Sequence, residues 1–303
     1  MNESLNYSLK TRAKTFHFAS FFFSKEIKKE INTLYVFCRY VDDISDSGGF
    51  SKREAQKKLK RITSDLKKKK SKDYIVKDFI ELMTRKSIQT QTPVMLIDGV
   101  IQDLGSVNLK SLENLVIYSY KVAGTVGLMI CNILKVNEKK MKFKGIQLGI
   151  AMQITNILRD IDEDLNRNRI YFPNEYLTYK NSKPKEILKN KSLQKQFSKD
   201  LKKLKVFSDL IYSNSRIGIY KLPLKYRVAI GLASRLYQGI GIKIENNNYN
   251  IWGRRYYLSL FEKLVKSIFV LFEVLFVKNL KENKKLEKYI NKTLFKLSKS
   301  YCD

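Results

Sequence analysis

Residues 153–164 read QITNILRDIDED, and a related pattern, YVFCRYVDDISD, occurs at residues 35–46. Each segment contains two aspartates four positions apart, namely Asp42 and Asp46, and Asp160 and Asp164. On an α-helix this spacing places both carboxylates on one face, one turn from each other. Acid is scarce in this chain, which has 59 Lys and Arg against 29 Asp and Glu. The two clusters are therefore its most informative feature.

A polar stripe extends from each aspartate pair toward the N-terminus of its segment. Steps of three or four residues align the side chains on one helix face. The stripes consist of Tyr35, Arg39, Asp42 and Asp46, and of Gln153, Asn156, Asp160 and Asp164. Apolar residues between them, such as Val36, Phe37, Ile154 and Ile157, predict that both helices are buried. A polar stripe on a buried helix is costly unless a bound group satisfies it.

The donor atoms of these stripes predict a hard metal ion. Oxygen ligands without histidine or cysteine favour Mg²⁺ or Mn²⁺ over zinc or copper. Magnesium usually keeps several waters and shares its coordination with substrate phosphates. Two facing aspartate pairs therefore suggest a diphosphate held by metal ions. A single acidic pair is most often a solvated helix face, but two clusters of matching geometry favour a site.

Six stretches of the chain resemble the head-to-head prenyl synthases, which comprise squalene, dehydrosqualene and phytoene synthases. In the family's order they are AKTF (13–16), YVFCRYVDDISD (35–46), YSYKVAGTVG (118–127), QITNILRDIDED (153–164), RIYFP (169–173) and RLYQGI (235–240). The resemblance implies an all-α fold, a single-domain isoprenoid synthase helical bundle over residues 1–303. Its two Asp-rich helices would face each other across a central cavity. Ala13 departs from the family, where many relatives carry serine.

The resemblance also implies roles for individual residues. The metal ligands would be Asp42, Asp46, Asn156, Asp160 and Asp164. The catalytic residues would be the four aspartates Asp42, Asp46, Asp160 and Asp164 with Arg39 and Tyr118. The substrate-binding residues would be Thr15, Phe16, Tyr35, Arg39, Gln153, Asn156, Arg159, Tyr171, Tyr237 and Arg254. Within that set the arginines, Thr15 and Tyr237 would face diphosphate oxygens.

The implied activity is that of a Mg²⁺-dependent prenyltransferase. Two geranylgeranyl diphosphates would condense head to head, through a cyclopropylcarbinyl (prephytoene) diphosphate, to phytoene in carotenoid biosynthesis. Residues 227–240 and the Arg254-Arg255 pair look most like bacterial 15-cis-phytoene synthases. The alternative is a squalene or dehydrosqualene synthase that acts on two farnesyl diphosphates. NADPH is not expected, because phytoene formation ends with the loss of a proton and no glycine-rich dinucleotide motif occurs.

Two other classes of function stay open. A non-catalytic relative would have lost acidic residues, whereas both aspartate pairs are intact here. The net charge of +30 gives affinity for nucleic acid, but no zinc-finger spacing or RNA-binding motif occurs, so no nucleic-acid partner is expected. The charge favours peripheral contact with an anionic membrane surface. We expect a cytoplasmic, peripherally membrane-associated protein, because no signal peptide, spanning helix or paired cysteine spacing is found.

Further expectations concern the cavity and the surface. A helix should begin after Ser24 and end at Gly48-Gly49. Apolar residues that could line the cavity are Phe16, Phe22, Val122, Ala123, Val126, Leu148 and Ile150. The small residues Ala123, Gly127 and Gly149 should set its depth, although close helix packing explains them equally well. Residues 180–205 should be exposed, residues 267–277 buried or interfacial, and residues 278–303 an amphipathic helix.

Overall fold

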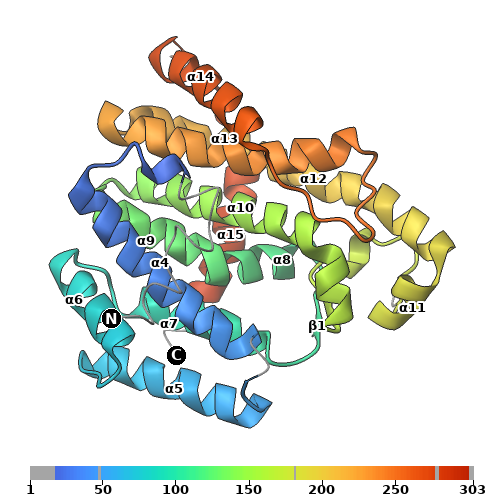
Figure 1. Cartoon of the computed structure of the whole chain (residues 1–303), viewed down its shortest axis with the longest axis horizontal. Coiled ribbons are helices and arrows are strands. Elements are labelled where there is room, and N and C mark those ends of the chain that lie inside the picture. The colour runs from blue at the N-terminus through green and yellow to red at the C-terminus, as the bar shows by residue number, and fades with distance from the viewer. Residues whose placement is uncertain (1–17, 47–48, 181, 277–279, 300–303) are drawn as a thin grey trace.

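The computed structural model describes residues 18–46, 49–180, 182–276 and 280–299 (Figure 1). Thr15 and Phe16, like Ala13, lie outside the described residues. The described chain is mostly helical and has only two strands of two residues each, which confirms the all-α fold. Its α-helices are α4 (Lys25–Asp46), α5 (Lys52–Lys68), α6 (Tyr74–Arg85), α7 (Gln91–Gln102), α8 (Leu112–Ser119), α9 (Thr125–Ile133), α10 (Lys139–Asn166), α11 (Pro184–Lys189), α12 (Lys191–Lys221), α13 (Leu224–Asn246), α14 (Leu260–Phe276) and α15 (Lys284–Lys299).

Local capping signals set the helix boundaries. The backbone N–H of Ile27 donates to Ser24 Oγ at 3.4 Å where α4 begins. The same helix ends at Asp46, so both predicted boundaries of this helix are confirmed. In α5, Ser51 and Glu54 form a capping box, which satisfies two backbone N–H groups at the helix start.

Helix α10, which carries the second aspartate pair, lies at the centre of the bundle. It packs along α12 and α13 on one side and along α9 on the other (Figure 1). The lysine-rich start of α12 is part of this packing, because Phe197, Leu201 and Leu204 are buried. The prediction of an exposed segment at residues 180–205 is therefore wrong for its C-terminal part.

Glycines allow α10 to approach its neighbour along the chain very closely. That neighbour consists of the π-helix η1 (Tyr120–Gly124) and α9. A Cβ atom at Gly127 would lie 2.2 Å from the carbonyl oxygen of Gly145, and one at Gly149 would lie 2.3 Å from that of Ala123. Both distances are far below van der Waals contact, so close helix packing explains these two glycines.

A pair of two-residue strands joins two loops that end at the site. Strand β1 (Val107–Asn108) follows α7, and strand β2 (Arg169–Ile170) follows α10. The strands are parallel, with Val107 opposite Arg169. This pairing brings the loop after α7 beside the loop after α10.

Two segments bear on the membrane expectations. Leu112–Ile133, which runs through α8, η1 and α9, is the one described helix long and apolar enough to cross a membrane by length and composition. It packs against α7 and α10, as core helices of bundles do, and therefore carries no argument for a membrane span. Helix α14 is not buried: it projects from the bundle beside α13 (Figure 1). The terminal helix α15 is amphipathic as predicted, with Leu286 and Ile290 buried.

Candidate active site

Helices α4 and α10 present their aspartates to one polar cavity of about 570 Å³. Ten of the residues predicted from the sequence line it: Arg39, Asp42, Asp46, Tyr118, Gln153, Asn156, Arg159, Asp160, Asp164 and Tyr171. These side chains come from three separate parts of the chain, and the bundle gathers them at one end of α4 and α10.

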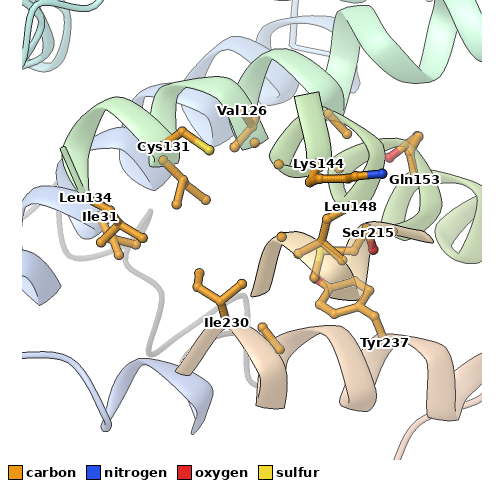
Figure 2. A pocket seen from close by; sticks show the side chains of 18 of the residues that line it. Ile31, Val126, Cys131, Leu134, Lys144, Leu148, Gln153, Ser215, Ile230 and Tyr237 are labelled. Atoms are coloured by element: carbon orange, nitrogen blue, oxygen red, sulfur yellow. The ribbon is translucent and has the colours of Figure 1, made fainter. Parts of the chain in front are cut away.

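An apolar cavity of about 270 Å³ adjoins the polar one. Tyr35 and Tyr237 line it, and Figure 2 shows Gln153 and Tyr237 toward one end and Ile31 and Leu134 toward the other. Four residues line both cavities: Asp42, Val122, Gln153 and Asn156. Asp42 therefore stands where the apolar cavity meets the polar one, and the other site aspartates line the polar cavity.

Some of the residues that the sequence predicted to line the apolar cavity lie elsewhere. Val122, Ala123, Val126 and Leu148 line the apolar cavity, but Phe22 and Ile150 do not. The Phe22 side chain is exposed, and Ile150 is fully buried. Both expectations are wrong, because an apolar side chain alone does not reveal which surface of its helix meets the cavity.

Arg254 lines neither cavity, whereas its neighbour Arg255 lines the polar one. Arg255 Nε lies 2.9 Å from Asp160 Oδ1, and its Nη1 lies 3.1 Å from Glu163 Oε2. The backbone N–H of Gly253 donates to Asp162 at 3.2 Å, which fixes this loop against α10. The Arg254-Arg255 pair thus marks the right loop, but its second member faces the acidic cluster.

Four arginines neutralise the aspartates in this structure. Arg159 forms a two-bond contact with Asp160, the next residue along α10, at 2.5 and 2.8 Å. Asp46 accepts from Arg169 at 2.9 Å and contacts Arg167 at 3.1 Å. Arg167 also contacts Glu163 of α10 at 2.8 Å, so it connects the acidic ends of α4 and α10. Arg255 is the fourth.

Two of the aspartates hold their protons unusually tightly. Burial, with the neighbouring Asp46 and Asp103 carboxylates, raises the pKa of Asp42 to about 7, although Arg39 opposes the rise. Burial and the Asp160 carboxylate raise the pKa of Asp164 to about 8. Clustered, poorly solvated carboxylates of this kind favour either a proton or a cation beside them.

Asp103 is a site residue that the sequence did not reveal. It follows α7 and accepts hydrogen bonds from the hydroxyls of Tyr118 at 2.9 Å and Tyr171 at 2.7 Å. The two tyrosine rings stack with their centroids 4.7 Å apart. Burial raises the pKa of Asp103 to about 6. A lone aspartate outside any acidic cluster carries no local signal, and only the β1–β2 pairing brings it to Tyr171.

Two buried polar atoms in the cavity lack a partner among the described residues. Asn156 Oδ1 accepts no hydrogen bond, although its Nδ2 donates to Gln153 at 3.2 Å. Arg39 Nε donates to no described residue, although Arg39 pairs with Asp43 through Nη2. An unsatisfied acceptor suits a cation, and an unsatisfied guanidinium donor suits an anion.

The donor set fits a divalent hard cation held with a second ligand. Carboxylate and amide oxygens are the ligands that Mg²⁺ prefers, and Mn²⁺ accepts them too. Within the described ranges, no three Asp, Glu, His or Cys side chains converge closely enough to hold a metal ion alone. The acidic faces are therefore incomplete by themselves, as expected where substrate phosphates supply further oxygens.

The fold and the site together define a protein of the helical isoprenoid synthase class. A squalene/phytoene synthase family model matches residues 9–262, and the chain belongs to this family. It is 28% identical to the 15-cis-phytoene synthase of Pantoea ananas, over 86% of this chain and 88% of that protein. It is 30% identical to the chloroplastic phytoene synthase of Daucus carota, over 84% of this chain and 65% of that protein.

Solved structures share the fold. A dehydrosqualene synthase in complex with a ligand superposes with a TM-score of 0.79 at 24% identity, over 88% of this chain and 94% of that one. A squalene synthase from Alicyclobacillus acidocaldarius superposes with a TM-score of 0.70 at 17% identity, over 82% of this chain and 93% of that one.

Proposed function

We propose that this protein is a Mg²⁺-dependent prenyltransferase that joins two geranylgeranyl diphosphates head to head, giving phytoene through prephytoene diphosphate, in carotenoid biosynthesis. The observation that carries the proposal is the junction of the two cavities at Asp42, Gln153 and Asn156. A prenyl diphosphate has the same division, with a charged head and an apolar chain. The similarity to bacterial and plant phytoene synthases supports the C20 substrate.

In this proposal the polar cavity holds the diphosphate. Asp42, Asp46, Asn156, Asp160 and Asp164 would hold Mg²⁺, or Mn²⁺ in its place. The bound metal would neutralise the diphosphate as it leaves. Arg39 Nε, which has no partner in the described part of the chain, is available to a diphosphate oxygen. Arg159 and Arg255, which neutralise Asp160 in this structure, can bind diphosphate oxygens once a cation takes that role.

The apolar cavity would shelter the carbocation that remains. Val122, Val126 and Leu148 line it and exclude the water that would capture the cation. The stacked rings of Tyr118 and Tyr171 present aromatic surface to the polar cavity, which favours nearby positive charge. The double bond of the second substrate would attack the cation, and loss of a proton would close the cyclopropane ring of prephytoene diphosphate. This intermediate would ionise in turn by releasing its diphosphate, rearrange, and lose a second proton to give the conjugated hydrocarbon.

The direct test is incubation of the purified protein with C15 or C20 prenyl diphosphate, with and without NADPH and Mg²⁺, followed by identification of the hydrocarbon. We expect phytoene from the C20 substrate, a requirement for Mg²⁺ or Mn²⁺, and no effect of NADPH. A second candidate function is dehydrosqualene or squalene synthesis from two farnesyl diphosphates, since the solved structures that share this fold include a dehydrosqualene synthase and a squalene synthase. A C15-derived product would establish it instead.

We also propose that the protein associates peripherally with anionic membranes. The net charge of +30 supports this, because anionic lipid attracts exposed lysines and arginines. The substrates and product are long apolar chains, which partition into lipid.

A further inference from the structure

Helix α14 has its polar and apolar faces reversed relative to a helix on a water-exposed surface. Its outward residues Phe261, Leu264, Ile268 and Phe272 follow steps of 3, 4 and 4, which is one helix face. They are 75%, 50%, 57% and 59% exposed. Leu260, Phe269 and Leu271 widen this exposed apolar surface. We call these seven residues the α14 outer face.

The opposite side of α14 carries its charged residues. Glu262 lies 2.9 Å from Lys243, and Glu273 pairs with Arg235, both on α13. Val270 and Val274 are the buried apolar residues on this side. Ion pairs thus face the protein while large apolar side chains face outward. A helix in water shows the opposite arrangement, and a contiguous exposed apolar patch marks a surface that something covers.

Basic residues and further aromatic residues adjoin the outer face. Arg227 Nη1 lies 3.4 Å from the carbonyl oxygen of Val274, which places the end of α14 beside the start of α13. Leu224, in the first turn of α13, is 54% exposed. The Phe23 ring lies 6.4 Å from that of Tyr226, so the turn containing exposed Phe21 and Phe22 belongs to the same region. Its exposed bases are Lys25, Lys221 and Lys225.

We infer that the α14 outer face inserts into the interfacial region of an anionic phospholipid membrane, with these lysines at the headgroups. Apolar side chains flanked by lysines are the pattern of interfacial helices, whose binding combines apolar burial with attraction to anionic lipid. A protein partner would have to cover the apolar side chains and also place acidic residues opposite the surrounding lysines. The charge of this chain matches anionic lipid instead.

The placement of α14 also connects the membrane to the apolar cavity. Ile219 of α12 lines that cavity. A Cβ atom at Gly231 would lie 3.4 to 3.7 Å from Val270, Ile219 and Val274, so these side chains converge there. One layer of α12 and α13 side chains therefore separates α14 from the cavity. This step rests on the proposed function, because only long apolar substrates would gain from it.

The test compares the protein with two triple variants in flotation assays. Phe261→Ser, Ile268→Ser and Phe269→Ser together remove three of the seven apolar side chains of the α14 outer face. The control, Tyr179→Ser, Val206→Ser and Leu210→Ser, alters three exposed apolar residues elsewhere. Vesicles contain phosphatidylcholine with or without phosphatidylglycerol. We expect the wild type and the control to bind the anionic vesicles, and the α14 variant to bind at least about 100-fold more weakly.

Salt separates insertion from charge attraction. At about 1 M salt, where screening acts within roughly 3 Å, the wild type should keep part of its binding. The inference would be overturned if the α14 variant bound anionic vesicles as tightly as the wild type does. It would also be overturned by a wild type that binds no vesicles but forms a dimer that the α14 variant loses in sedimentation. If the α14 variant unfolds, Phe261→Ser alone, at the first turn of the helix, should still weaken binding about 10-fold.

Turnover keeps this inference distinct from the proposed function. With detergent-dispersed prenyl diphosphates the α14 variant should release diphosphate at the wild-type rate, because no residue of its outer face lines either cavity. If all three proteins are inactive but differ in vesicle binding as expected, the proposed function fails and the membrane face stands. If the wild type and both variants are active and bind vesicles equally, only the inference about the α14 outer face is overturned.

Discussion

Asn156 Oδ1 and Arg39 Nε line the same cavity with opposite polarity, and neither finds a partner among the described residues. The amide oxygen belongs to the second aspartate helix and the guanidinium to the first. Buried polar atoms are costly to leave unsatisfied. Their combination on facing helices is what a site for a metal-bound diphosphate requires.

The first prediction concerns Asn156. Asn156→Leu keeps a similar volume and removes the unsatisfied oxygen, so the Mg²⁺ concentration for half-maximal turnover should rise about 10- to 100-fold. Metal-free stability should change by no more than about 1 kcal/mol, since only the bond to Gln153 is lost. Mg²⁺ titrations of turnover and thermal melts without metal measure the two effects. An unchanged Mg²⁺ requirement in the folded variant would exclude Asn156 as a ligand.

The second prediction concerns the aspartates. Asp42→Asn and Asp160→Asn should each lower diphosphate release by at least about 100-fold, because each removes a negative charge from one acidic face of the proposed metal site. Asp42→Asn should leave the metal-free fold intact, because burial already favours the uncharged carboxyl. Asp78→Asn, on the exposed face of α6, removes the same charge and serves as the control. Near-normal turnover in either site variant would defeat the two-face arrangement.

The third prediction concerns pH. Native Asp42 and Asp164 have pKa values of about 7 and 8, above the ordinary value for aspartate. Mg²⁺ needs the charged carboxylates, so its binding should release protons, and its affinity should rise between about pH 6 and pH 9. Calorimetric titrations in buffers of different ionisation enthalpy would measure the protons released. Equal affinity at both ends of this range would contradict the prediction.

The same pKa values fix the sign of the stability change without metal. The native state holds these protons more tightly than the unfolded chain does. Its free energy of unfolding should therefore gain most from the two groups below about pH 4 and lose that contribution as pH rises through about 8. Mg²⁺ should restore stability above pH 8. Melting curves across this pH range, with and without Mg²⁺, test the direction of the stability change for Asp42 and Asp164 together.

The fourth prediction separates helix packing from cavity depth. Gly127→Ala should destabilise the protein by about 1 to 3 kcal/mol or more, because its Cβ would overlap the Gly145 carbonyl. Gly105→Ala is the matched control, since its Cβ would approach only Gln102 O, at 3.9 Å. Denaturant unfolding gives both values. Equal stability of the two variants would show that α9 and α10 can move apart without cost.

The fifth prediction concerns chain length. Val126 lines the apolar cavity (Figure 2), and Val126→Phe would shorten the space available to a prenyl chain. Overpacking of this size should shift the C15-to-C20 ratio of kcat/KM toward C15 by about 5- to 150-fold. Competition between the two substrates measures the ratio. A uniform loss of activity on both would mean that Val126 supports the fold without limiting the chain.

The sequence predicted those parts of the site that lie on single helices. The spacing of Asp42 and Asp46, and of Asp160 and Asp164, fixes their relative positions, because the helical repeat alone sets them. The boundaries of α4 were equally readable, since Ser24 and the Gly48-Gly49 pair are local signals. Matching stretches of sequence were enough to indicate the family.

Side-chain convergence from separate segments depended on the tertiary structure. The sequence does not indicate that Asp103 meets Tyr118 and Tyr171, or that Arg255 rather than Arg254 meets Asp160. The small size of Gly127 is visible in the sequence, but the neighbouring carbonyl is not. These contacts join residues far apart in the chain, and no local repeat specifies their distance.

The sequence by itself determined that two acidic helix faces exist, that the chain folds as helices, and that oxygen ligands suit a hard cation. Tertiary structure decided that both faces meet one polar cavity, that an apolar cavity joins it, and that α14 turns its apolar side outward. The physical reason is the separation along the sequence of the residues that determine each feature. Helix faces follow from spacing over a few residues, whereas the surface that each face meets follows from packing between distant segments.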